Sequence, residues 1–426
     1  MEAVNTSLDR LVLFRPGPDS LLARMAPALD RIDLAPSALH DLLAEAVANG
    51  WQGDLWHCVL TQALVESENP FSLACERRKA AQDSLWDVAL QDMAAYRELF
   101  SHRLPRAFDV ALDFHHENPD APRREAGRRI QALAESLVRA GKPETMLAIL
   151  TRYYERHGLG MLGLGQLFRV EEASGHARLF PVEGRRSVKL DDLVGYQGQK
   201  EQLIQNTQAF LAGHHANNVL LYGDAGTGKS TSVQAITNEY AAQGLRLIEL
   251  YKHQFPLIPD LLSQIKGRNY RFILLLDDLS FEENEVEYKH LKAVMEGGGE
   301  AAPENVLIYA TSNRRHLIRE TWSDRSDMQH DGDVHRSDTM EEKLSLAGRF
   351  GLQIYYPNPT YEEYHNIVRT LAGRTAGLES LTGEQLRAAA STWQVRHGSR
   401  SGRTAQQFIN DLLCHTPQES ENRKTC

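Results

Sequence analysis

The stretch GDAGTGKS at residues 223–230 is the most informative part of the chain. It matches the pattern Gly-x-x-x-x-Gly-Lys-Ser at every fixed position. It stands between an apolar run, NNVLLY, and a helical pattern, STSVQAITNEYAAQG. A glycine-rich turn between a strand and a helix lets backbone N–H groups approach phosphate oxygens, and the start of the helix favours their negative charge. The sequence therefore predicts a phosphate-binding loop at this position.

Two side chains of this loop have expected roles. Lys229 should reach the β- and γ-phosphates of a nucleotide, and the hydroxyl of Ser230 should bind Mg²⁺. The residues expected to hold the nucleotide here are Gly223, Asp224, Ala225, Gly226, Thr227, Gly228, Lys229, Ser230 and Thr231.

A second part of the site is predicted by RFILLLDDLSFEENE at residues 271–285. This stretch has the pattern of a buried strand that ends in two carboxylates. Asp277 is expected to hold Mg²⁺ through water, and Asp278 to orient or deprotonate an attacking water. Glu282 or Glu283 could assist, although such a charged run is more typical of a solvated face.

The third part is ENVLIYATSNRRHL, another predicted strand, which ends at Asn313. A phosphate-binding loop, an acidic strand end and a strand ending in asparagine, in this order, resemble an AAA+ ATPase. The resemblance implies that Asn313 is the sensor-1 residue, between the acidic strand end and the γ-phosphate. It also implies that Val194 and Gly195, in LDDLVGYQGQKEQL, lie near an adenine. The preference for ATP over GTP rests on this resemblance, and the chain has no Asn-Lys-x-Asp guanine motif.

Two arginine roles follow from the same resemblance. EKLSLAGRFGLQI is similar to the segment that carries an arginine finger, which makes Arg349 the candidate, with Arg319 and Arg325 as rivals. GSRSGRTAQQF is similar to the sensor-2 helix, where Arg403 is better placed than Arg400. An arginine finger acts on the nucleotide of a neighbouring subunit, so the resemblance implies a homo-oligomer, for which a ring is one arrangement.

Taken whole, the chain resembles an uncharacterised bacterial group of AAA+ ATPases, a domain of unknown function. NPFSLACE, LDDLSFEENEVEYKHLKAVMEGG and EKLSLAGRFGL carry this resemblance. One position departs from the pattern of many motor ATPases, because Asp278 stands where they carry glutamate. Aspartate is one methylene shorter, so hydrolysis remains possible but the water would sit differently.

The patterns along the chain predict a fold class and its domains. Residues 1–157 have helical periodicity, and 158–189 form a linker with a small hairpin turning at residues 174–175. GLGMLG matches a dinucleotide fingerprint, but a helical stretch precedes it, and we reject that interpretation. Short apolar runs alternating with helices predict an α/β P-loop core of AAA+ type, a doubly wound parallel sheet, over 190–356. A small helical lid follows over 357–415, and a flexible tail over 416–426.

Composition and charge indicate which classes of binding partner to expect. The chain has 426 residues, a net charge of −10 and a pI of about 6.0, so nucleic-acid binding is possible but not indicated. Short basic clusters at residues 77–79, 123–124 and 128–129 are interpreted as solvated faces. The four cysteines are widely spaced, which favours reduced thiols. There is no apolar leader and no membrane-length apolar run, so we expect a cytoplasmic protein without a membrane partner.

Three functions remain open at this point. The first is an oligomeric, Mg²⁺-dependent ATP hydrolase that remodels an unknown protein client. The second is an ATPase similar to replication initiators or helicase loaders, and the third is a slow ATP-dependent switch or scaffold. The polar stretch at residues 321–343 is predicted to be a surface loop, or else a gating segment ordered by nucleotide.

Overall fold

The computed structural model divides the chain into two compact units. Unit 1 comprises residues 1–168, 180–186 and 265–270, and unit 2 comprises residues 169–179, 187–264 and 271–426. Within these units, the structure describes residues 4–30, 35–79, 82–102, 104, 106–118, 121, 123–182, 188–281, 287–296, 302–313, 346–378 and 382–415.

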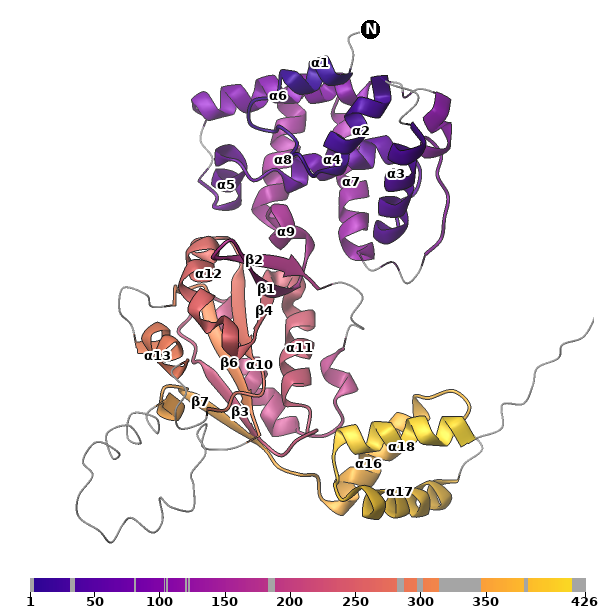
Figure 1. The fold of residues 1–426 in the computed structure, drawn as a ribbon, viewed down its shortest axis with the longest axis vertical. Coiled ribbons are helices and arrows are strands. Elements are labelled where there is room, and N and C mark those ends of the chain that lie inside the picture. Colours follow the sequence, from indigo (N-terminus) through magenta and orange to yellow (C-terminus); the bar gives the residue numbers. More distant parts are fainter. Residues whose placement is uncertain are drawn as a thin grey trace, which may run out of the picture. The chain divides into compact units, whose positions relative to one another are not determined.

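Unit 1 is built from helices (Figure 1). They pack around one apolar core, to which the helices contribute side chains at helical spacing. The elements are α1 (Val4–Asp9), α2 (Leu21–Asp30), α3 (Ala35–Asn49), α4 (Leu55–Glu66), α5 (Pro70–Glu76), α6 (Ser84–Phe100), η2 (Arg106–Ala111), α7 (Arg124–Ala140), α8 (Pro143–His157) and α9 (Gly160–Leu164).

Helix α4 lies at the centre of this core. Its start is fixed by Asp54, whose side chain accepts the backbone N–H of His57. Nearly every residue of α4 is buried, as expected for a helix enclosed on all sides. The buried hydroxyl of Tyr154 donates to the carbonyl of Leu64 over 2.6 Å, which fixes α8 to α4.

Residues 265–270 belong to unit 1 although they are flanked in sequence by unit 2. Arg268 donates from Nε and Nη2 to the two carboxylate oxygens of Glu76, at 2.8 and 3.0 Å, and both side chains are buried. Tyr270 donates from its hydroxyl to the carbonyl of His157 and packs against Gly158, where a Cβ would lie 1.5 Å from that hydroxyl. Gly158 begins the GLGMLG stretch, which leads from α8 into α9 and follows no strand.

Unit 2 is built on a sheet of mostly parallel strands. Among the described residues, five strands run parallel in the order β4-β5-β6-β3-β7. They are β3 (Val219–Gly223), β4 (Leu245–Leu250), β5 (Arg271–Leu276), β6 (Val306–Ser312) and β7 (Leu352–Tyr356). A hairpin of β1 (Leu167–Ala173) and β2 (His176–Pro181) extends the sheet beyond β4. Ser174 and Gly175 form its turn with positive φ, as a two-residue hairpin requires.

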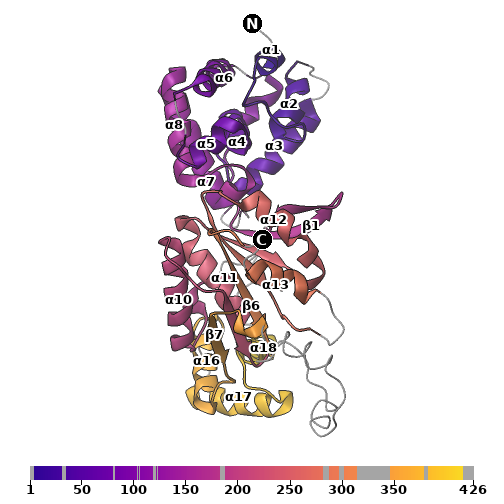
Figure 2. The ribbon, with the colours of Figure 1, turned by 90° about the vertical axis from the view of Figure 1, so that its left-hand side faces the viewer.

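Helices cover both faces of this sheet (Figure 2). α10 (Gln197–Leu211) and α11 (Lys229–Tyr240) lie on one face, and α12 (Ile258–Ile265) and α13 (Tyr288–Glu296) on the other. β4 and β6 are buried along their whole length, the pattern of parallel strands enclosed on both sides. Tyr309 of β6 shows how a helix is fixed to the sheet, because its hydroxyl lies 2.8 Å from that of Thr207 on α10. Short 3-10 turns η3 (Leu190–Asp192), η4 (Ala241–Gln243) and η5 (Lys252–Leu257) join these elements.

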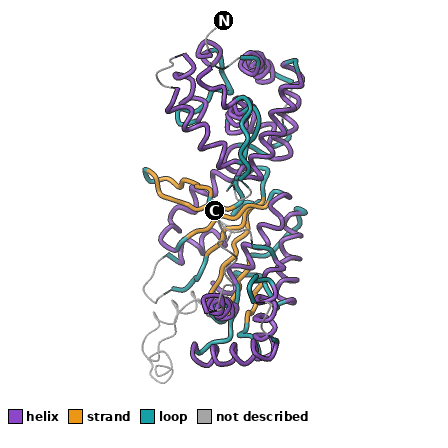
Figure 3. Tube along the Cα trace, turned by 90° about the vertical axis from the view of Figure 1, so that its right-hand side faces the viewer, coloured by secondary structure: helices purple, strands orange, loops and turns teal. Residues whose placement is uncertain are grey.

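Three helices follow β7 and form the lid. They are α16 (Tyr361–Gly373), α17 (Gly383–His397) and α18 (Gly402–His415). Thr360 and Thr382 start the first two with capping boxes, each accepting the backbone N–H three residues on. The lid has its own small core, formed around Tyr364, Phe408 and Ile409. Figure 3 colours the strands of the sheet orange and the helices purple.

The predicted fold class is confirmed: a helical N-terminal region, an α/β core with a mostly parallel sheet, and a small helical C-terminal part. The attachment of the hairpin to the sheet was not predicted. The predicted domain boundaries stay predictions. Within the described ranges, no helix is both long and apolar enough to cross a membrane. The predicted polar loop at 321–343, the tail at 416–426, Arg319, Arg325, Glu282 and Glu283 lie outside the described residues.

Candidate nucleotide site

The predicted phosphate-binding loop connects β3 to α11. β3 ends at Gly223 with φ 134°, where a Cβ would lie 2.1 Å from the carbonyl oxygen of Tyr356. Gly226 and Gly228 have φ of 79° and 92°. Glycine adopts such conformations without the strain that a side chain would add. The loop can therefore turn sharply onto the N-terminus of α11, which favours bound anions.

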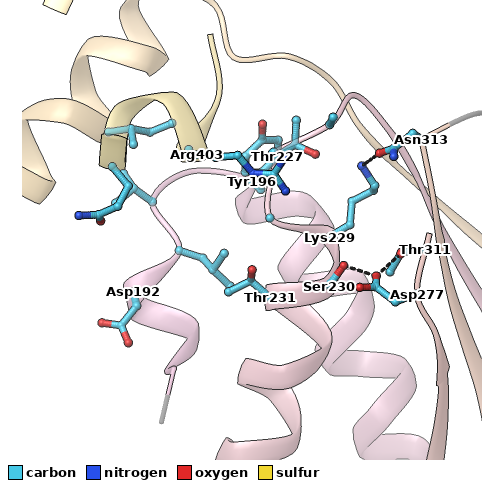
Figure 4. A pocket seen from close by; sticks show the side chains of 18 of the residues that line it. Asp192, Tyr196, Thr227, Lys229, Ser230, Thr231, Asp277, Thr311, Asn313 and Arg403 are labelled. Carbon is cyan, nitrogen blue, oxygen red and sulfur yellow. Dashed lines mark hydrogen bonds between the residues drawn. The ribbon is translucent and has the colours of Figure 1, made fainter. Parts of the chain in front are cut away.

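The ammonium group of Lys229 is held at the mouth of this loop. Its Nζ donates to the carbonyl oxygens of Gly223 and Asp224, at 3.0 and 2.7 Å, and to Oδ1 of Asn313 at 3.0 Å (Figure 4). These contacts use the three donors that a lysine offers. Lys229 is 6% exposed. These protein contacts alone hold the ammonium group of Lys229 beside the strand ends.

The electrostatic surroundings of Lys229 are those of a partly desolvated cation. Burial lowers the pKa of its ammonium group, and the charge of Arg403 lowers it further. The carboxylates of Asp224, Asp278 and Asp277 act in the opposite direction. A cation in such a site attracts phosphate oxygens more strongly than one in water, because the local dielectric constant is lower.

Ser230 and Asp277 meet at the next position. The Ser230 hydroxyl donates to Oδ1 of Asp277, and the hydroxyl of Thr311 donates to the same atom over 2.6 Å (Figure 4). The Thr311 hydroxyl also accepts the backbone N–H of Asp278 at 3.0 Å. A hydroxyl and a carboxylate in contact are hard oxygen ligands, the kind that Mg²⁺ prefers.

Asn313 links the loop to the acidic strand end because of its place in the sheet. It follows β6, and β6 lies between β5 and β3. Its Oδ1 accepts from Lys229, and its Nδ2 donates to Oδ1 of Asp278 over 2.7 Å. Asp278 has φ 52°, so the chain turns away directly after β5. Lys229, Asn313 and Asp278 form a hydrogen-bonded chain across the carboxyl ends of three strands.

A pocket of about 670 Å³ opens beside these groups. Its lining comes from the phosphate-binding loop, the strand ends, the segment before α10 and the lid. The lining residues are Asp192, Leu193, Val194, Tyr196, Ala225, Gly226, Thr227, Gly228, Lys229, Ser230, Thr231, Asp277, Asp278, Thr311, Asn313, Ile367, Leu371, Gly402, Arg403 and Gln406.

The pocket also has apolar lining residues. Val194 packs against the core of the lid, beside the lining residues Ile367 and Leu371 of α16. Such a surface suits the face of a planar base, whereas the lysine and the glycine-rich loop suit phosphates. One pocket therefore contains both kinds of contact that a nucleotide needs.

The lid touches the phosphate-binding loop directly. The backbone N–H of Arg403 donates to the carbonyl of Gly226 over 3.3 Å. A Cβ on Gly226 would lie 2.8 Å from the hydroxyl oxygen of Ser401 and 3.1 Å from Cβ of Arg403. The start of α18 can approach so closely because the loop has no side chain there.

Tyr196 joins the pocket to the connection between β7 and the lid. Its hydroxyl donates to the carbonyl of Pro357 over 2.9 Å, and its ring lies 5.1 Å from that of Tyr356. Burial raises the pKa of Tyr196, so it stays a neutral hydrogen-bond donor. Tyr196 also has a left-handed backbone, with φ 55°.

The structure brings together most of the residues that the sequence predicted for this site. All of 225–231, together with Val194, Asp277, Asp278, Asn313 and Arg403, line the pocket. Gly195, Gly223, Asp224 and Arg349 do not line it, and neither does Arg400. Asp224 contributes a carbonyl to Lys229, while its carboxylate accepts the backbone N–H of Asn358. Arg349 is exposed at the turn before β7.

Sequence reasoning did not single out several of the lining residues. Thr311 belongs to the polar end of β6, so its strand position could have revealed it. Ile367, Leu371 and Gln406 could not be found, because helical periodicity does not tell which face of a lid helix meets the loop. Tyr196 directly follows the predicted Val194 and Gly195 but had no pattern of its own.

The donor set fits ATP and Mg²⁺. Gly226 and Gly228 place no side chain in the path of a phosphate, and a Cβ on Gly228 would lie 2.9 Å from Leu193 Cδ2. Ser230 and Asp277 would supply oxygen ligands for the metal. Lys229 provides the positive charge for phosphate oxygens.

A parallel core with the strand order β4-β5-β6-β3-β7, a phosphate-binding loop after β3 and a helical lid on that loop define an AAA+ module. The chain belongs to the family described as Protein of unknown function (DUF815), whose model matches residues 165–416.

Curated relatives match a short part of the chain. The large subunit of replication factor C from Methanococcus maripaludis strain C6 is 34% identical over 86 residues, which are 20% of this chain and 17% of that protein. The same subunit from Staphylothermus marinus is 38% identical over 71 residues, 16% of either chain. The chain therefore spans less than a fifth of these relatives. Among solved structures, the Thermotoga maritima RuvB Holliday junction branch migration motor has 16% identity and a TM-score of 0.31, covering 53% of this chain and 72% of that one.

Proposed function

We propose that the chain binds and hydrolyses ATP with Mg²⁺ at this pocket. The observation that carries the proposal is the hydrogen-bonded chain Lys229–Asn313–Asp278, next to the contact between Ser230 and Asp277. It sets a cation, a polar bridge, a carboxylate and a metal-ligand pair around one phosphate-binding loop. Phosphoryl transfer requires this combination of positioning and charge.

Each residue has a role in the proposed reaction. Ser230 and Asp277 would hold Mg²⁺, which supplies positive charge to the phosphate oxygens when bound. Lys229 exchanges a carbonyl partner for the β- and γ-phosphates. Asp278 uses Oδ1 for Asn313, and its Oδ2 hydrogen-bonds to no described residue. That oxygen orients the attacking water and accepts its proton.

The finer part of the proposal is that the active form is a homo-oligomer. Arg349 does not line the pocket of its own chain and is exposed at the turn before β7. This position suits an arginine that completes the site of a neighbouring subunit. Coupling of ATP hydrolysis to remodelling of a macromolecular client would use the lid contact at Gly226, which ties phosphate binding to α18.

Two alternatives have support of their own. Asp278 is one methylene shorter than the glutamate of many motor ATPases, which favours a slow switch that retains nucleotide. The partial match to replication factor C large subunits favours a role in DNA replication, as a loader or initiator-like ATPase.

The test is phosphate release from MgATP per subunit over a range of protein concentrations. The proposal expects turnover that rises with concentration, is abolished in Lys229→Met, and falls in Arg349→Ala with nucleotide affinity unchanged. Arg396→Ala, an exposed lid arginine, is the matched control. Turnover independent of concentration and of Arg349 would exclude a shared site. Tight binding without turnover would leave the switch as the function.

A further inference from the structure

Three arginines of unit 1 converge on a second hollow, which has no part in the nucleotide site. Arg78 follows the end of α5, and Arg152 and Arg156 lie on α8. With Glu155, they line a hollow of about 390 Å³. Helices α5 and α8 pack side by side, as Figures 1 and 2 show. The fold thus brings Arg78 close to Arg152 and Arg156, which are more than 70 residues further along the chain.

The three guanidinium groups are available for a ligand. All three residues are exposed, and none of these groups hydrogen-bonds or ion-pairs with a residue that the structure describes. Glu155 is the one acid among the described residues of the lining, which carries three arginines, so this lining is net positive. Like charges in one hollow repel each other, and an anion removes that repulsion. Arginine forks are also the groups that bind phosphate oxygens in pairs.

Arg78 occupies a backbone position that normally favours glycine. Its φ is 55°, in the left-handed region. Its N–H donates to the carbonyl of Cys75 and that of Lys79 to the carbonyl of Ala74, at 2.9 and 2.8 Å, which closes the end of α5. Glycine is preferred at such helix ends because a side chain adds strain. The strain of Arg78 is explained if its side chain has a use in the hollow.

We propose that this hollow binds phosphate groups of a nucleic-acid backbone. Arg152 and Arg156 are one helical turn apart, so two of the three exposed cations form a row along α8, and Arg78 adds a third from the end of α5. A row of arginines suits the successive phosphates of a polyanion. Among the residues that the structure describes, no aromatic ring lines the hollow. Bases have nothing to stack on there, and the contact is with the backbone and independent of base sequence.

The proposal is tested by fluorescence anisotropy of a short labelled DNA duplex, titrated with the full chain at several salt concentrations and without ATP. The Arg152→Ala/Arg156→Ala double variant is expected to bind at least about 10-fold more weakly at low salt. The slope of log K against log salt, which is negative, should become less steep by about 2, since two phosphate contacts are lost. Arg97→Ala/Arg106→Ala removes two exposed arginines of unit 1 outside the hollow and is the matched control.

A second variant separates binding from folding. Arg78→Gly is expected to raise the melting temperature, because glycine tolerates the left-handed backbone, and to weaken DNA binding at the same time. A merely structural Arg78 would not give these opposite effects. Equal affinities of the double variant and its control would overturn the proposal. So would a wild type that binds a phosphoserine peptide through this hollow but does not bind DNA.

Discussion

Asn313 donates a hydrogen bond from Nδ2 to Oδ1 of Asp278 over 2.7 Å, while its Oδ1 accepts from the ammonium of Lys229. The amide therefore bridges the group that would bind phosphate and the group that would act on water. This bridge depends on the sheet order, because β6 places Asn313 between β3 and β5.

Replacing the bridge should affect catalysis more than binding. We expect Asn313→Ala to lower kcat about 100-fold, because Asp278 loses the donor that orients it, with little change in ATP affinity. Phosphate release and fluorescent-nucleotide binding measure the two effects. Asn366→Ala, an exposed asparagine on α16, should leave both unchanged. An unchanged kcat in Asn313→Ala would show that the bridge has no catalytic role.

We expect Lys229 to destabilise the nucleotide-free protein, although it would bind the nucleotide. Burial lowers its pKa, so Lys229→Met is expected to melt at the same temperature as the wild type or higher without nucleotide. With MgATP at 100 times its Kd, the wild type should gain about 2.7 kcal/mol and the variant nothing. Thermal melting with and without MgATP checks this, and Lys289→Met on α13 serves as the control. A ligand-induced shift that survives in Lys229→Met would place the nucleotide elsewhere.

The contact between the loop and the lid can be tested at Gly226. Gly226 has a left-handed backbone, which a side chain would strain. A Cβ there would also lie 2.8 Å from the hydroxyl oxygen of Ser401. We expect Gly226→Ala to lose roughly 1–2 kcal/mol of stability to backbone strain. We also expect it to bind nucleotide at least about 10-fold more weakly, because the contact with the lid is disturbed. Gly398→Ala carries similar strain at φ 70° but has nothing within 4 Å. Comparable nucleotide affinity in the two variants, measured by titration, would mean that the lid contact does not matter for binding.

The pH dependence of unit 1 should contain a contribution from Glu45. Burial alone would raise the pKa of its carboxyl, but the hydrogen bond and charge of Arg123 and hydrogen bonds from Gln62 and Asn49 lower it overall from 4.5. Arg123 donates to both carboxylate oxygens, at 2.6 and 3.1 Å. Because the folded pKa lies below the unfolded one, the stability from ionised Glu45 is present above pH 4.5. It is lost as the pH falls from there through the folded value.

Glu45→Gln should therefore lower the free energy of unfolding by about 1–3 kcal/mol at neutral pH. The difference from wild type should shrink as the pH falls below 4.5. Chemical denaturation at a series of pH values measures this difference. Glu98→Gln removes the exposed partner of Arg10 and should change little. A difference for Glu45→Gln that stays constant with pH would exclude the ion pair as its cause.

Sequence reasoning predicted the carboxyl-end residues because parallel strands place them at one edge of the sheet. Asp277, Asp278 and Asn313 follow strands with a clear apolar pattern, and Lys229 was found from the glycine-rich pattern of its loop. The lid residues depend instead on how α16 and α18 rest on the loop, a packing relation between residues far apart in sequence. Periodicity identified the helices of the lid but not their contact at Gly226.

The features of unit 1 were hidden for a similar reason. Arg268 and Glu76 are 192 residues apart, and no local pattern predicts that they meet. Arg78 was interpreted from its neighbours in sequence as part of a solvated face. Its proximity to Arg152 and Arg156 depends on how α5 packs on α8.

The most direct test of the proposed ATPase is a single-turnover measurement on wild type and Asp278→Asn, with ATP binding measured in parallel. Asn keeps the size of the side chain and removes the carboxylate that would accept the proton. We predict that both proteins bind MgATP with similar affinity and that the variant converts it to ADP at least about 100-fold more slowly. Equal rates of ADP formation in the two proteins would contradict the account.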